Sequence, residues 1–220
     1  MGLVAKQKDA GGAPVEPGSW PAVCVGYADL GTQSSTFDGQ AVVAEKVLIF
    51  WDIPDQRIAW QGKDMPRRIS ARYTLSLGAK ANLRKVLEAW RGKEFTSAEL
   101  AGFDLDKLIG APCLLNITHR PRKDGGVFGA VSTIMALPRG MPTPHMEVEP
   151  VRYLCRNETT GEFVLPGEAI PPWVREIIAE SREAKQAGWT YRREHGESAA
   201  ATVASTPAPV PVVEDDDIPF

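Results

Sequence analysis

Between residues 20 and 137 the sequence changes from a strand-like to a helical pattern and back again. This order of elements restricts the folds that the chain can adopt. Three segments rich in β-branched and aromatic residues come first, at 20–31, 42–53 and 69–77. The third alternates strictly between apolar and polar side chains, as a half-buried strand does. A helical stretch follows, and strand-like segments return at 111–120 and 127–137. The sequence therefore predicts three strands, a helical insert and two strands.

The helical insert has clear start and stop signals. A helix is predicted over 78–92 and ends at Gly92, because apolar residues recur at helical spacing at Leu83, Val86, Leu87 and Trp90. Thr96, with Glu99 three residues later, forms a capping box that predicts a second short helix over 96–100. Residues 104–110 add one more turn.

Five strands with a helix between the third and the fourth are the layout of the oligonucleotide/oligosaccharide-binding (OB) barrel. We therefore predict an all-β fold with a helical insert, a five-stranded OB barrel over residues 20–145. Other small β-barrels share much of this pattern and stay open as alternatives at this point.

The segments that flank the predicted barrel differ from it in composition. Residues 1–19 are rich in Gly, Pro and Lys and predict a flexible N-terminus. Residues 146–196 form a C-terminal extension, with a helix near 170–188 that prolines begin and Gly188 ends. Residues 197–220 are predicted to be a disordered linker, rich in Ala, Ser, Thr, Pro and Val, that carries an acidic tip.

The formal charge is divided unevenly along the chain. Residues 197–220 carry five acidic residues and no Lys or Arg, a charge of −5. Because the whole chain carries −3, residues 1–196 carry +2. The chain ends on a carboxylate-rich and apolar tip, Asp215, Asp216, Asp217, Ile218, Pro219 and Phe220. A solubilising tail explains the carboxylates but not the Ile-Pro-Phe ending, so the tip predicts recruitment of a protein partner.

The chain lacks the sequence patterns of common catalytic and metal sites. His119, His145 and His195 are scattered, without Cys or acidic residues at metal-ligand spacing, so neither a metal nor a cofactor is predicted. Phosphate-binding loops and nucleophile motifs are missing as well, so no catalytic residue is assigned and an enzyme is not expected. Three unpaired cysteines, no apolar leader and no 18-residue apolar run predict a cytoplasmic protein without a membrane partner.

The terminal "DDDIPF" resembles the C-terminal tip of bacterial single-stranded DNA-binding proteins. The body, from about residue 20 to 145, resembles phage-type members of that group. The stretches that carry the resemblance are "DLGTQ" (29–33), "KVLIFWDI" (46–53), "YTLSL" (73–77), residues 82–119 and "LPRGMPTP" (137–144). The resemblance does not extend to residues 150–196.

This resemblance implies an OB fold that coats single-stranded DNA without marked sequence preference and has no catalytic activity. It also implies that the tip recruits enzymes of replication, recombination or repair, in a bacterial cell or a phage-infected host. Since many such barrels pair, a homo-oligomer is expected. The alternative is an adaptor whose tip docks on those enzymes while the barrel binds no DNA.

A protein that binds unpaired nucleotides needs exposed rings for the bases and cations for the phosphates. Alternation along 42–53 places Lys46 and Phe50 on one face, which is predicted to point outward. Trp51 falls on the opposite face, which is predicted to enter the core. Phe50 is therefore favoured over Trp51 as a stacking residue. The loop 54–68, the polar face of the third strand and the hairpin 118–126 supply the other candidates, Arg57, Trp60, Lys63, Arg67, Arg68, Arg72, Arg120, Arg122 and Lys123.

Overall fold

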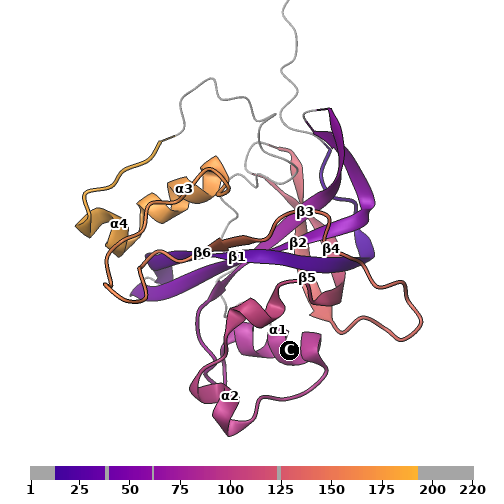
Figure 1. The fold of residues 1–220 in the computed structure, drawn as a ribbon, viewed down its shortest axis with the longest axis horizontal. Coiled ribbons are helices and arrows are strands. Elements are labelled where there is room, and N and C mark those ends of the chain that lie inside the picture. The colour runs from indigo at the N-terminus through magenta and orange to yellow at the C-terminus, as the bar shows by residue number, and fades with distance from the viewer. Residues whose placement is uncertain (1–12, 38–39, 61, 123–124, 193–220) are drawn as a thin grey trace, which may run out of the picture.

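A strongly curled antiparallel sheet organises the chain (Figure 1). The computed structural model describes residues 13–37, 40–60, 62–122 and 125–192. The strands lie in the order β3-β2-β1-β4-β5. Their bounds are β1 Gly18–Phe37, β2 Gln40–Trp60, β3 Lys63–Thr74, β4 Pro112–Pro121 and β5 Val127–Met135. The predicted order of three strands, a helical insert and two strands is confirmed.

The first two strands are longer than the sequence predicts. Residues 32–37 and 54–60 were expected in loops, but they continue β1 and β2. The added part of β1 pairs with the start of β2, from Thr32 opposite Glu45 to Phe37 opposite Gln40. These rungs consist largely of Ser, Thr, Ala and Gln, so no apolar alternation marks them as strand.

The concave side of the sheet holds one hydrophobic core, which the helical insert covers. The insert comprises α1 Asn82–Arg91, α2 Ser97–Ala101 and the 3-10 turn η1 Leu105–Leu108. From α1, Leu83, Leu87 and Trp90 enter this core. Trp51 of β2 packs against Trp90, with ring centres 5.8 Å apart. The predicted end of α1 at Gly92 and the Thr96–Glu99 capping box are both confirmed.

The convex side of the sheet holds a second core, which the C-terminal extension builds. The extension contains β6 Val151–Tyr153, α3 Pro172–Ala179 and α4 Arg182–Gln186, and it lies across the sheet from the helical insert (Figure 1). Val174 and Ile178 of α3 are fully buried there. The single predicted helix over 170–188 is instead two helices, and the Ser181 hydroxyl caps the second by accepting from the Ala184 amide at 3.1 Å.

A glycine allows the extension to approach β1 closely. β6 runs parallel to β1, with Gly26 opposite Val151. A Cβ atom on Gly26 would lie 1.8 Å from the Val151 carbonyl oxygen, and its φ of +143° disfavours other residues. The residue at this position therefore decides whether β6 can pair with the sheet.

The second core corrects the expected orientation of β2. Leu48, Phe50 and Asp52 were expected to face outward with Lys46, but each is at most 3% exposed. Alternation correctly separates the two faces of β2, and both faces are covered. The prediction that Phe50 lies on an outward face is therefore wrong, and Trp51 is fully buried in the first core.

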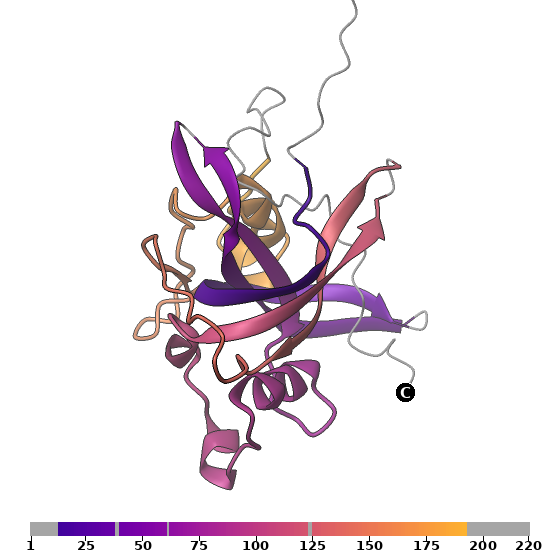
Figure 2. The same ribbon diagram turned by 90° about the vertical axis from the view of Figure 1, so that its right-hand side faces the viewer.

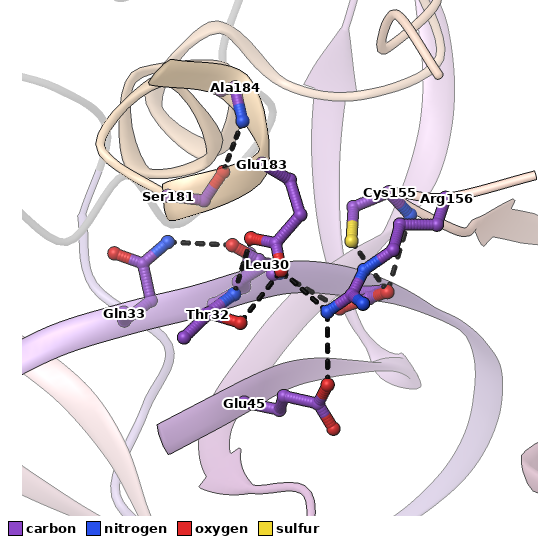
Figure 3. Close-up of polar contacts among 11 residues, drawn as sticks. Leu30, Thr32, Gln33, Glu45, Cys155, Arg156, Ser181, Glu183 and Ala184 are labelled. Carbon is purple, nitrogen blue, oxygen red and sulfur yellow. Dashed lines mark hydrogen bonds and ion pairs between the residues drawn. The ribbon is translucent and has the colours of Figure 1, made fainter. Parts of the chain in front are cut away.

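A polar cluster fastens the extension to the β1–β2 hairpin (Figure 3). The Glu183 carboxylate of α4 accepts hydrogen bonds from the Thr32 amide at 2.8 Å and the Thr32 hydroxyl at 2.7 Å. Arg156 bridges Glu183 at 2.5 Å and Glu45 at 3.0 Å. Burial opposes ionisation of Glu183, but the hydrogen bonds from Thr32 prevail and lower its pKa. The cluster fixes α4 against β1.

Truncation tests the dependence of the sheet on its extension. A fragment of residues 1–145 leaves the apolar convex face in water, at a cost of about 25 cal/mol per Å². We expect this fragment to aggregate or unfold at a lower temperature than a matched fragment of residues 1–196. Thermal unfolding and light scattering measure the difference. Equal unfolding temperatures for the two fragments would contradict the assignment of a second core.

Candidate nucleic-acid interface

The register of β2 and β3 gathers several predicted cations on one face of the sheet. Lys46 lies opposite Thr74, Leu48 opposite Arg72, Phe50 opposite Ser70 and Asp52 opposite Arg68. Because opposite residues in an antiparallel pair share a face, Lys46, Arg68 and Arg72 all belong to the convex side. They lie toward the β3 edge of that side.

Arg68 is neutralised by an acid on the neighbouring strand. Its Nε donates to Oδ1 of Asp52 at 2.7 Å and its second guanidinium nitrogen to Oδ2 at 3.1 Å. Asp52 is only 2% exposed, and this burial raises its pKa although Arg68 acts in the opposite direction. The pair holds β3 against β2, so the charge of Arg68 is already used inside the protein.

Lys46 and Arg72 are not neutralised in this way. Lys46 donates to the Thr74 hydroxyl at 2.7 Å, which leaves its charge uncompensated. Arg72 is half-buried and forms no ion pair with any residue that the structure describes, and this burial lowers its pKa. Between Arg72 and Arg68 on the same strand face, the buried Ser70 hydroxyl has no hydrogen-bond partner in the described chain. An anion such as a phosphate would compensate the charge of either cation.

The predicted basic loop between the second and third strands is a β-hairpin. Arg57 forms ion pairs with Asp64 at 3.0 Å and with Glu147 of the extension at 2.9 Å. These carboxylates, Glu147 first, raise its pKa. Lys63 is exposed at the start of β3. The backbone of Trp60 ends β2, and its side chain lies outside the described part of the structure.

A second hairpin, formed by β4 and β5, projects from the same end of the sheet (Figure 2). Arg120 lies opposite Phe128 within it, and the Arg122 amide donates to the Gly126 carbonyl at 2.7 Å. Both arginines are half-buried. Lys123 lies outside the described residues.

The segment that leads into β1 lies between the two hairpins (Figure 2). Arg67 of β3 donates to the Ala13 carbonyl, and a ring nitrogen of His119 lies 2.9 Å from the Val15 carbonyl. The Glu16 amide donates to the Gln56 side chain at 2.8 Å, and Val15 enters the first core. Residues 13–19 are thus packed, in contrast to the flexible segment expected over 1–19, whose residues 1–12 lie outside the described chain.

The structure leaves other predictions without a test. The linker and the tip, including Asp215, Asp216, Asp217, Ile218, Pro219 and Phe220, lie outside the described residues. Within the described ranges, His, Cys, Asp and Glu form no group that could hold a metal ion. Over the same ranges, no helix is both long and apolar enough to cross a membrane.

Comparison with known proteins adds no family assignment. No family model and no curated protein matches the chain.

The Arg68–Asp52 pair generates a stability prediction. Arg68→Ala leaves a buried carboxylate without its partner, which costs about 3–5 kcal/mol of unfolding free energy near neutral pH. Without Arg68 the folded-state pKa of Asp52 rises further, so protonation relieves the cost and the deficit shrinks as the pH falls. Denaturant unfolding at several pH values measures this.

Lys63→Ala is the matched control, since it removes an exposed cation from the same strand and should change stability by less than about 0.5 kcal/mol. If Arg68→Ala unfolds at the same denaturant concentration as the unchanged protein, the pair does not support the sheet.

Proposed function

We propose that this protein binds and coats single-stranded DNA without marked sequence preference. One observation carries the proposal: Lys46 and Arg72 lie on the same face of the sheet and have no acidic partner in the described chain. Phosphates supply the negative charge that these two cations lack. Lys63 and Arg120 add cations on the two adjacent hairpins.

The proposal includes an OB barrel as the fold of residues 20–145. Three features support it. The sheet order places β1 between β2 and β4, the helical insert lies between β3 and β4, and β3 contacts β5 across the open side of the curled sheet. An OB barrel has this order of strands and this position of the helix. The resemblance to phage-type single-stranded DNA-binding proteins agrees with it.

The proposed role joins coating with recruitment. The tip, residues 214–220, recruits enzymes of replication, recombination or repair in the cytoplasm of a bacterium or phage host, and the protein itself is not an enzyme. A homo-oligomer extends the bound length of DNA. The adaptor alternative has one observation in its favour: Phe50, Trp51, Arg57 and Arg68 are all used within the fold.

Titration of oligothymidine tests DNA binding directly. We expect binding in dilute buffer that weakens with salt, since each phosphate neutralised on a single strand contributes about −0.7 to the slope of log K against log salt. Lys46→Gln and Arg72→Gln should each weaken binding and flatten the slope by about that amount. Lys85→Gln, the control, removes an exposed cation of α1 and should change neither the DNA affinity nor the salt slope. Failure of the unchanged protein to bind oligothymidine in dilute buffer would overturn the proposal.

Deletion of residues 214–220 tests the tip. The tip carries four acidic side chains on a long linker and competes with DNA for the cations, so its deletion should tighten DNA binding at low salt. It should also abolish capture of partner enzymes in a pull-down. The control is deletion of residues 198–204, which are uncharged and seven in number like the tip. This deletion should neither tighten DNA binding nor abolish partner capture.

Phe220→Ala separates the two roles of the tip. This variant keeps every acidic side chain, so partner capture should be lost while DNA affinity stays unchanged. Unaltered DNA binding and unaltered partner capture after removal of the tip would contradict both roles.

A further inference from the structure

Base stacking requires aromatic rings that solvent can reach, and few are available here. The sequence placed its stacking candidates on β2 and on the hairpin that follows, but Phe50 and Trp51 are buried. Among aromatic side chains that the structure describes, five are half-buried and none is more exposed: Trp20, Phe103, Phe163, Trp189 and Tyr191. The last three belong to the C-terminal extension, where Trp189 contacts both of the others.

These three rings form a continuous row. The ring centres of Phe163 and Trp189 are 5.6 Å apart with a tilt of 39°, and those of Trp189 and Tyr191 are 6.0 Å apart with nearly parallel planes at 19°. We call Phe163, Trp189 and Tyr191 the aromatic row. It lies on the convex side of the sheet, since Phe163 and Trp189 pack against the second core.

The end of α4 builds the row. Gly188 has a φ of +69° and its amide donates to the Lys185 carbonyl, while the Trp189 amide donates to the Ala184 carbonyl at 2.9 Å. This left-handed turn ends the helix and directs Trp189 back toward Phe163. Tyr191 follows two residues later, with its ring stacked on that of Trp189.

Cations accompany the aromatic row. The Arg175 guanidinium carbon lies 5.7 Å from the centre of the Tyr191 ring. Arg175 donates to the carbonyls of Ile170 at 2.8 Å and Gly167 at 2.9 Å, which orient the guanidinium without neutralising it. Arg192 is exposed and follows Tyr191 directly. Neither arginine forms an ion pair with a residue in the described ranges.

The groove beside the aromatic row and the two other half-buried rings, Phe103 and Trp20, are less suited to a nucleic acid. A groove of about 770 Å³ beside Phe163 is lined by Glu45, Glu162 and Glu183 and by Arg156 and Arg182, so its acids outnumber its bases and it offers a phosphate no excess of positive charge. The Phe103 ring packs edge-on against Phe95 at 5.2 Å, and Arg91 and Lys107 lie over it. The Trp20 indole donates to the Glu16 carbonyl and packs on the first core.

We propose that the aromatic row is a second contact surface for single-stranded DNA, on which unpaired bases stack while Arg175 and Arg192 contact the phosphates. This inference rests on the proposed function and deepens it. The bound DNA then contacts Lys46 and Arg72 at the β3 edge and continues onto the C-terminal extension on the same side of the sheet.

Tyr191→Ala tests the aromatic row. Tyr191 belongs to neither hydrophobic core, so the variant should keep the unfolding temperature of the unchanged protein. Loss of one stacked base lowers affinity for a long oligothymidine by about 5- to 150-fold. Tyr191→Phe keeps the ring and should bind as the unchanged protein does. Phe103→Ala, a half-buried ring in the helical insert, should leave DNA affinity unchanged.

Tryptophan fluorescence gives a second readout. Stacking of a base quenches a tryptophan, so part of the fluorescence change on adding oligothymidine should disappear in Trp189→Phe. If Tyr191→Ala kept full DNA affinity and Trp189→Phe showed the same fluorescence quenching as the unchanged protein, the aromatic row would not be a DNA contact. The proposed function would survive that result if Lys46→Gln and Arg72→Gln still weakened binding. Absence of binding by the unchanged protein would remove both proposals.

Discussion

The packing of the C-terminal extension on the convex face of β1 and β2 is the interaction on which the rest of the structure depends. It buries Leu48, Phe50, Val174 and Ile178 in one core and gives the sheet apolar contacts on both sides. The first core alone would leave a half-barrel with an apolar outer face. The sheet between the two cores is therefore fixed from both sides, and the groups at its β3 edge are held on a rigid support.

This packing also determines which charges a ligand can use. Arg57 forms ion pairs that include Glu147 of the extension, and Arg68 compensates the buried Asp52. Lys46 and Arg72 lie on the same face, and acids of the described chain do not compensate their charges. Counting basic residues overstates the positive surface, because ion pairs within the fold remove part of it. The position of an arginine relative to buried carboxylates matters more than its presence.

The sequence predicted the order of strands and helices, the end of α1 and the capping box of α2, because periodicity and capping are local properties. It also assigned Arg68 and Arg72 to one face of the third strand. It could not place Phe50, since alternation separates two faces of a strand without telling which of them another segment covers. The burial of Val15 could not be predicted, because one apolar residue among Gly and Pro gives no periodic signal. The row of Phe163, Trp189 and Tyr191 joins residues that only the turn at Gly188 and the bridge between Arg156 and Phe163 bring together.

The contacts between Thr32 and Glu183 join residues 151 positions apart in the chain. Because β5 ends at Met135, a ribosome releases β1 to β5 before it releases the segment around Glu183 that covers them. During that interval the outer face of β1 and β2 is uncovered, and contacts of such long sequence separation form slowly. Biosynthesis thus includes a stage in which the nascent sheet is prone to self-association, and it ends when α4 reaches Thr32.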